Sequence, residues 1–553
     1  MNQTASESLP KAGAGAGRKV PGLGRIVRST VIVMVASAAA KAISLAQTVV
    51  VADRFGPEWD TYVAASSIPD LLVILISGGA LIQAFLPVFA GFLAEEDRPR
   101  AWRLASATIN TVFLAALVLA VIAFAFAPWL VPNALAPGFA DRPEQVALTV
   151  ELLRILLLSS IIFSVSGLFM GILQAHQNFF LPALAAVFQD SGLLFGILFL
   201  VGPLGLHGVA WGAVIGAACH FLIQVPGLIH FGARWSPVLG WNLPELRLVV
   251  RLMIPRVIGL GLVFWFNLRF IPIYIGSRLD EGSIAAYLWG WQLMQIPETL
   301  LGTALAIVIF PTLATLSALG DVEGKRRALS GSVRYILAAT IPAAFGMLLI
   351  GRPLISLLER GAFDPALGDL VYSTTAAFTL GLITHAGLEV VARGFYADKD
   401  TMTPLFTAVA AAAVNLLLAL ALSTPWGVGG VALANSVAIL VEVVLLLAIL
   451  RRRWDGIDEA RLLGTGVRAL AASLAMAVAV LVAQALMRAV GVGGEGASLL
   501  MTVVYIAVAA GVGVVVYLAA GAALNMEEVR VIPRLVRSRR RRAPAAETAE
   551  TTG

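Results

Sequence analysis

Three polar side chains recur at every third position in an otherwise apolar stretch of the chain. They are Gln292, Gln295 and Glu298, in a run that begins at Trp289 and continues through an apolar segment to Pro311. Residues at this spacing lie along one face of a helix and form a polar stripe. Lipid cannot satisfy polar groups, so the stripe must face protein or a water-filled cavity. Its chemistry is hydrogen bonding to a polar ligand.

Other apolar segments also contain ionisable or amide side chains, namely Lys41, Gln47, Asp70, Asp190, Asn267, Arg269 and Glu389. A charge at the bilayer centre costs roughly 2.5 kcal/mol or more, so several retained charges indicate a hydrated interior or mutual pairing. Positions near span ends explain Asp70, Arg256 and Glu389 equally well. Lys41 is predicted to face the cavity. Cations in the first and seventh segments would give that cavity a positive potential, which suits an anionic substrate such as a phosphate.

Composition indicates the elements that hold these residues. Of 553 residues, 59% are hydrophobic and only 13% are charged, and the mean hydropathy is +0.89. Soluble domains carry roughly 25% charged residues, so the sequence predicts an all-α polytopic membrane protein. About fourteen apolar segments are long enough to span a bilayer. They fall at about 29–52, 62–93, 102–130, 146–175, 180–202, 206–231, 253–276, 284–317, 332–350, 367–397, 403–422, 427–450, 463–488 and 498–523.

Basic residues cluster at both ends of the chain and in alternate loops. Five cations precede the first segment, and seven arginines lie between Arg530 and Arg542. The positive-inside rule explains this pattern without a nucleic-acid partner and places both termini in the cytoplasm. The first 25 residues lack the features of a signal peptide.

Two pairs of landmarks indicate an internal duplication. Ile68-Pro69-Asp70 is echoed by Ile296-Pro297-Glu298, and Leu173-Gln174-Ala175 by Phe395-Tyr396-Ala397. Six segments per repeat predict two six-helix lobes related by a pseudo-two-fold axis along the membrane normal, followed by two further helices. The predicted division is an amino-terminal tail (1–25), a first lobe (26–232), an interfacial cytoplasmic linker (233–252), a second lobe (253–451), two extra helices (452–523) and a basic tail (524–553).

Enzymatic motifs are absent from the sequence. There is no Walker loop, no dinucleotide fingerprint and no His/Cys cluster, and the five histidines are scattered. We therefore expect no catalytic site, no metal site and no cofactor. The single cysteine, Cys219, permits no intramolecular disulfide.

Several local patterns, in order along the chain, carry a family resemblance. They are Phe55-Gly56 with Asp60, Ile68-Pro69-Asp70-Leu71-Leu72, Gln83-Ala84-Phe85-Leu86-Pro87, Ala136-Pro137-Gly138-Phe139-Ala140-Asp141, Leu293-Met294-Gln295-Ile296-Pro297, Glu359-Arg360-Gly361-Ala362-Phe363 and Gly394-Phe395-Tyr396-Ala397. Over about residues 30 to 520 the chain resembles the MurJ (MviN) lipid II flippases of the multidrug/oligosaccharidyl-lipid/polysaccharide exporter superfamily. The resemblance implies two lobes in a V around a cationic cavity, and alternating access coupled to membrane potential or ions.

The sequence departs from the family in that cavity. The first of the family's cavity arginines is kept as a cation, Lys41, and the aspartate after the first span is kept as Asp60. The other arginines fall on Gln47, Val73 and Gln292, and two acids fall on Gly78 and Gln295. Amides can hydrogen-bond a sugar or peptide, but they cannot neutralise a diphosphate. Arg269 or Arg256 is a candidate to compensate from the seventh span.

The resulting prediction is a flippase for an undecaprenyl-diphosphate-linked peptidoglycan precursor, lipid II, in the bacterial cytoplasmic membrane. The alternatives are a paralogue that moves another polyprenol-linked saccharide, and a transport-inactive cell-wall scaffold. The expected partners are the lipid-linked glycan and membrane lipids, with a coupling ion and cell-wall synthesis proteins as further candidates. The predicted substrate-binding residues are Lys41, Gln47, Asp60, Asn267, Arg269, Gln292, Gln295 and Glu298.

Overall fold

The computed structural model describes residues 46–76, 79–176, 178–257, 263–492 and 499–530, with Ala39, Ile43 and Ser44. Within these ranges the ordered elements are all helical, and eleven helices are long and apolar enough to cross a membrane. The prediction of an all-α polytopic membrane protein is confirmed. The predicted tail 1–25, Lys41 and residues 531–553 lie outside the described part of the chain.

The boundaries of the apolar helices do not coincide everywhere with those of the fourteen predicted segments. Helix α17 (Met402–Arg453) contains both the eleventh and the twelfth segment, joined at Gly427, where φ is 55° and ψ is −142°. Only glycine adopts such a backbone readily, so the chain changes direction there without a loop. The predicted first segment is described only in part, and the seventh is divided among several short helices.

The amino-terminal lobe consists of the elements up to the linker. They are η1 (Gly56–Glu58), α2 (Trp59–Ile76), α3 (Gly79–Ala94), α4 (Arg98–Leu130), η2 (Val131–Leu135), η3 (Pro137–Phe139), α5 (Pro143–Ala175), α6 (Phe180–Phe195), η4 (Gly196–Leu200), α7 (Val201–Leu204), α8 (Leu206–Leu222) and α9 (Val225–His230). Helices α6 and α8 touch through glycines: a Cβ on Gly192 would lie 2.3 Å from the Gly216 Cα. Small residues allow such close approach between membrane helices.

Helix α10, which packs on α3 and α4, and the carboxy-terminal lobe follow. They are α10 (Pro244–Arg256), α11 (Val263–Trp265), η6 (Phe266–Phe270), α12 (Ile271–Gly276), α13 (Ser283–Glu298), η7 (Thr299–Thr303), α14 (Ala304–Ala318), α15 (Val322–Ser356), α16 (Pro365–Ala397) and α17. Helices α18 (Glu459–Ala489) and α19 (Leu499–Ala523) form a hairpin at the edge of this lobe. An apolar cluster that includes Ile341, Met476 and Tyr517 packs the hairpin on α15.

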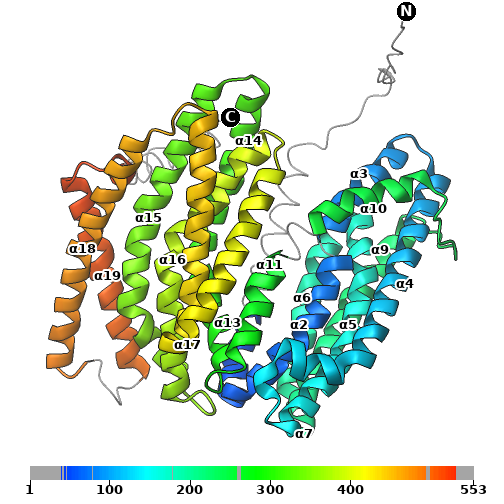
Figure 1. Ribbon diagram of the computed structural model, residues 1–553, viewed down its shortest axis with the longest axis horizontal. Coiled ribbons are helices and arrows are strands. Elements are labelled where there is room, and N and C mark those ends of the chain that lie inside the picture. Colours follow the sequence, from blue (N-terminus) through cyan, green and yellow to red (C-terminus); the bar gives the residue numbers. More distant parts are fainter. Residues whose placement is uncertain are drawn as a thin grey trace, which may run out of the picture.

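The two lobes approach each other at the lower end of Figure 1 and stand apart at the upper end. At the lower end, segments 53–67 and 136–145 of the amino-terminal lobe meet segments 273–286 and 361–363 of the carboxy-terminal lobe, and we call this contact the junction. Its apolar part includes Val63, Phe139, Ile273 and Ile284, all at most 3% exposed. The junction therefore fixes how the two lobes are placed relative to each other, and with them the side chains that face the space between the lobes.

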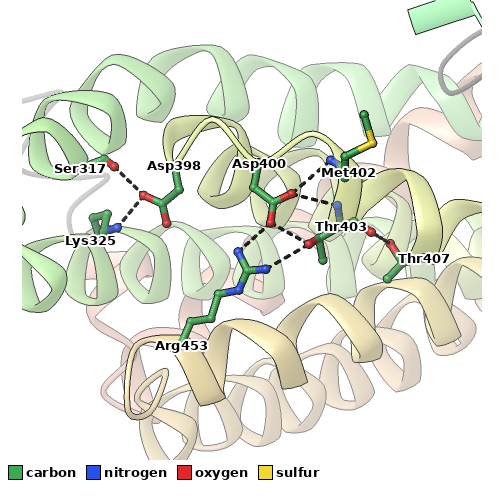
Figure 2. A network of polar contacts seen from close by, with 8 residues as sticks. All are labelled: Ser317, Lys325, Asp398, Asp400, Met402, Thr403, Thr407 and Arg453. Atoms are coloured by element: carbon green, nitrogen blue, oxygen red, sulfur yellow. Dashed lines mark hydrogen bonds and ion pairs between the residues drawn. The ribbon is translucent and has the colours of Figure 1, made fainter. Parts of the chain in front are cut away.

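A polar network ties the carboxy-terminal lobe together at the opposite end, in the turn between α16 and α17 (Figure 2). Asp398 accepts hydrogen bonds from Ser317 and Lys325, and Asp400 accepts them from Thr403 and Arg453. Burial opposes ionisation of Asp400, but the Thr403 side chain and backbone and the Arg453 guanidinium outweigh it and lower its pKa to about 2. The pKa of Asp398 is likewise lowered: partial burial opposes this, and Lys325 and Ser317 outweigh it.

Candidate functional site between the lobes

Backbone N–H groups are the donors in several hydrogen bonds that cross the junction. The Ala362 N–H donates to the Asp53 carbonyl at 2.7 Å, and the Gly138 N–H donates to Ser277 Oγ at 3.1 Å. A Cβ on Gly138 would lie 1.9 Å from the Ser277 carbonyl oxygen, and one on Gly56 would lie 2.1 Å from that of Ala362. Glycine is thus required at both positions for the lobes to meet as they do.

Asp60 lies inside this junction rather than in open space. It is 4% exposed, and its two carboxylate oxygens accept hydrogen bonds from the backbone N–H groups of Gly282, at 3.0 Å, and Ala285, at 2.7 Å. Those groups form the start of α13, whose N–H groups have no partner within the helix. An acid of one lobe therefore caps a helix of the other, and its oxygens are already occupied.

Asp70 and Arg269 form an ion pair between the lobes, outside the segments that make the junction. Asp70 is on α2 and Arg269 is on η6, and Asp70 Oδ2 lies 3.1 Å from Arg269 Nη2. The side chains are 43% and 32% exposed. Ion pairs with such exposure contribute only about 0–1 kcal/mol to stability. This pair is therefore accessible and easily broken, unlike the buried Asp60.

The two predicted glutamines near the inter-lobe space have different surroundings. Gln47 is 8% exposed, and its Nε2 donates to the Asp190 carbonyl at 2.5 Å, within the amino-terminal lobe. Gln292 is exposed, and its Oε1 accepts a hydrogen bond from Thr48 at 3.4 Å, across the lobes. Gln292 is thus available to a ligand, whereas the amide of Gln47 already has a backbone partner.

The remaining members of the polar stripe become more buried along the helix, away from the exposed Gln292. Gln295 is half-buried, and Glu298 is 9% exposed. Glu298 accepts hydrogen bonds from Thr299, at 3.4 Å, and Thr303, at 3.3 Å, both in the π-helical turn η7. Three-residue spacing advances around the helix, and the stripe therefore runs from the inter-lobe space into the carboxy-terminal lobe.

Asn267 faces into the carboxy-terminal lobe. Its Oδ1 accepts a hydrogen bond from Asn415 on α17 at 2.8 Å, and its own Nδ2 donates to the Val263 carbonyl at 3.0 Å. The pair fixes η6 to α17. Of the predicted site residues, Lys41 lies outside the described residues, and so does the Arg256 side chain.

Sequence reasoning missed two features of this site. One is a buried bond across the lobes: Trp265 Nε1 donates to the Ser67 carbonyl at 2.8 Å. The other is the pairing of Asp70 with Arg269, although a signal existed, because opposite charges in two apolar segments each need a partner. Among the described members of the predicted set, Arg269 is the cation. The arrangement can hold an anion at Arg269 and hydrogen-bond polar groups at Gln292.

Comparison with known proteins agrees with this architecture. The family model for lipid II flippase MurJ matches residues 52–510. A probable lipid II flippase MurJ from Rhizobium tropici is 30% identical over 407 residues, which cover 72% of this chain and 75% of that one. A lipid II flippase MurJ from Burkholderia cenocepacia is 28% identical over 420 residues, which cover 74% and 80%.

Solved structures share the fold. A lipid II flippase MurJ in an inward closed conformation matches with a TM-score of 0.74 and 22% identity, over 89% of this chain and 98% of that one. An inward-facing multidrug transporter of the MATE family, in the MOP superfamily, matches with a TM-score of 0.61 and 15% identity, over 76% and 96%. The match over residues 52–510 and the two-lobed helical fold place this chain in the MurJ lipid II flippase family.

Proposed function

We propose that this protein flips lipid II, an undecaprenyl-diphosphate-linked peptidoglycan precursor, across the bacterial cytoplasmic membrane. The observation that carries the proposal is the family match over residues 52–510, which includes every described segment of the junction. Membership in a flippase family favours a transporter over a catalyst. Lipid II carries a diphosphate and a polar disaccharide-pentapeptide, so a path between two lobes suits it better than a closed pocket.

The proposed mechanism is alternating access about the junction. The positive-inside rule assigns the arginine-rich loops and both termini to the cytoplasm, and the junction then lies on the periplasmic side. In Figure 1 the described helices of the two lobes meet at the junction and diverge at the other end, and we assign this arrangement to the cytoplasm-facing state of the cycle. Release on the far side requires the junction to separate while the cytoplasmic ends close.

The proposed substrate contacts divide by chemistry. Arg269, with Lys41, would bind the diphosphate, because a guanidinium pairs bidentately with phosphate oxygens. Gln292 and Gln295 would hydrogen-bond the sugar or peptide. Asp60, Gln47, Asn267 and Glu298 have protein partners in this conformation, so any contact that they make with substrate belongs to another state of the cycle.

The test is rescue of a bacterial strain in which the resident lipid II flippase can be depleted. We expect this chain to restore growth, and the variant Arg269→Ala to fail at equal membrane abundance. Arg100→Ala is the control, because Arg100 is an exposed arginine that pairs within its own helix turn with Asp97. Failure of the wild-type chain at normal abundance would contradict the proposal.

Growth rescue together with an assay of lipid movement in proteoliposomes separates the alternatives. A paralogue for another polyprenol-linked saccharide would not rescue growth, but would move its own lipid in proteoliposomes. A transport-inactive scaffold would move neither. The family match does not favour either alternative, and the coupling ion and cell-wall partner proteins remain predictions.

A further inference from the structure

We infer that Asp70 occupies the place of the substrate's diphosphate on Arg269, and that an incoming diphosphate displaces Asp70 and releases a tie between the lobes. This inference rests on the proposed function, since it names the group that the substrate's anion must compete with. It adds a residue, Asp70, that acts on binding in the opposite sense to Arg269.

The placement of the pair supports this competition. Asp70 belongs to α2 of one lobe and Arg269 to η6 of the other, with 3.1 Å between their nearest polar atoms. Each side chain keeps about a third or more of its surface exposed, so a ligand can reach the pair. Asp60, on the same helix, has both oxygens covered by backbone N–H groups and offers no such access. Of the two carboxylates on α2, that of Asp70 is the one positioned to exchange with a ligand.

The backbone around Arg269 is held in place, so exchange can occur without loss of local structure. Asn267 is tied to Asn415 of α17, which belongs to the same lobe. The π-helical turn η6 also stacks Phe266 on Phe270, with ring centroids 5.2 Å apart. A π-turn redirects a side chain relative to a regular helix and recurs at functional positions. The Arg269 side chain can therefore change partners while its helix stays fixed.

The charges favour the diphosphate in this exchange. A carboxylate offers one negative charge, whereas a diphosphate offers more charge and a geometry that a guanidinium binds bidentately. Exposed ion pairs are weak, so little is lost when Asp70 leaves. The freed Asp70 carboxylate then faces the bound anion from the other lobe, and like charges repel. Substrate binding thus removes an attraction between the lobes and replaces it with a repulsion.

The consequence is a link between substrate binding and lobe position. A ligand shifts a conformational equilibrium only by its differential affinity for the two states. Here the state with the Asp70–Arg269 pair intact binds the diphosphate less well than the state with the pair broken. By reciprocity, the bound diphosphate disfavours the tied state by the same factor.

The decisive test is the direction in which two substitutions move affinity for lipid II. Full-length protein in nanodiscs would be titrated with lipid II, and with pyrophosphate as a second probe. Asp70→Asn should tighten binding roughly two- to fivefold, the factor that an exposed ion pair contributes. Arg269→Gln should weaken it roughly tenfold or more, because a charge-assisted contact is lost. A pair that is merely structural would instead give weaker binding in both variants, which would overturn the inference.

Inter-lobe distance provides the second readout. Spin labels at Glu95 and Leu319, both exposed, would report the separation of the open ends in a Cys219→Ser background. Lipid II should change the distance distribution of the otherwise wild-type protein. Asp70→Asn should shift the distribution in the same direction without ligand, and lipid II should then add a smaller change than it does in the wild type. A ligand response in Asp70→Asn as large as that of the wild type would also overturn the inference.

The controls separate this inference from the proposed function. Arg142 and Glu281 form another pair across the lobes, at 2.8 Å, on the exposed edge of the junction and away from Arg269, so Glu281→Gln should leave lipid II affinity unchanged. The neutral double variant Asp70→Asn/Arg269→Gln leaves no unpaired charge and tests binding if a single variant misfolds. If the wild type neither binds nor moves lipid II, the proposed function fails. The pyrophosphate titration then still decides whether Asp70 competes for Arg269.

Discussion

Two aspartates on α2, Asp60 and Asp70, have opposite relations to their surroundings. Asp60 is 4% exposed and bound to two backbone N–H groups, whereas the Asp70 side chain is 43% exposed and bound to one arginine. A buried acceptor with several donors is costly to replace, and an exposed ion pair is not. Residue type and helix are identical, so the environment alone assigns Asp60 to the junction and Asp70 to the inter-lobe space.

Replacing Asp60 by asparagine should weaken the junction. The amide keeps one acceptor but turns an NH₂ group toward a backbone N–H, which leaves at least one buried donor without a partner. The expected cost is about 1–3 kcal/mol in stability of the joined state, seen as a larger inter-lobe distance and a lower thermal midpoint.

The matched control is Asp97→Asn. Asp97 caps α4 in the same way, by accepting from the Arg100 N–H at 3.1 Å, but both groups belong to one exposed turn. Its replacement should lower the thermal midpoint slightly without changing inter-lobe distance. Equal distance changes in the two variants would contradict the role of Asp60 at the junction.

The lowered pKa of Asp400 should make the free energy of unfolding depend on pH. Its pKa lies near 2, below the ordinary value of 3.8, because its hydrogen bonds to Thr403 and Arg453 outweigh the effect of burial. A lowered pKa stabilises the fold above about pH 4, and this contribution disappears as pH falls through 2. With the side chain 20% exposed, we expect about 1–2 kcal/mol.

The measurement compares wild type and Asp400→Asn by thermal unfolding in detergent at pH 7 and pH 3. The variant should be less stable at pH 7, and the difference should shrink at pH 3. Glu58→Gln, at an exposed position, should match the wild type at both values. A pH-independent difference for Asp400→Asn would show that lost packing, not charge, is responsible.

At the scale of elements, close contact of backbones across the junction depends on glycine. Gly138→Ala would place a methyl group 1.9 Å from the Ser277 carbonyl oxygen, a distance that no rotamer can relieve. The lobes must then move apart, and the conformation joined at this end should lose population. Flipping in proteoliposomes should fall severalfold, while the fold of each lobe persists. Gly202→Ala is the control, because no atom lies within 4 Å of its added Cβ.

The helices themselves were largely predictable from the sequence, because hydropathy over about 20 residues reports a membrane span regardless of its neighbours. The internal irregularities were not. The π-turns η6 and η7 lie in segments whose sequence has the pattern of a continuous apolar helix. Hydropathy predicts a segment boundary at Gly427. It does not predict the positive φ by which Gly427 joins two spans into α17.

The candidate site was less predictable than the fold. Asp60 and Gly282 are separated by 222 residues, and no local pattern reveals that one caps the helix that begins after the other. The spacing predicts that the polar stripe lies on a helix, as α13 shows, but it does not predict that Gln292 is exposed and Glu298 is buried. Periodicity identifies a face, whereas the neighbours of that face come only from the tertiary arrangement.

At the scale of the whole molecule, we expect that the junction must open once in each transport cycle. Cysteines in place of Arg142 and Glu281, in a Cys219→Ser background, would lie on opposite lobes at the position of a 2.8 Å ion pair. A short bifunctional thiol reagent should then abolish flipping. Cysteines at Glu151 and His207, which pair at 2.9 Å within one lobe, should be crosslinked without loss of flipping. Full activity of the first crosslinked protein would exclude movement at the junction.

Because Asp60 caps α13 from the other lobe, amide hydrogen exchange at the start of α13 reports opening of the junction. The N–H groups of Gly282 and Ala285 are protected by an acceptor from the other lobe, so they lose that protection whenever the lobes part. Their deuterium uptake therefore measures the fraction of time that the junction spends open. The Gly324 N–H, which donates to Asp321 inside its own turn, reports fraying alone. Deuterium uptake at these amides, measured by mass spectrometry on the unmodified chain in a native membrane, would therefore report how often the junction opens.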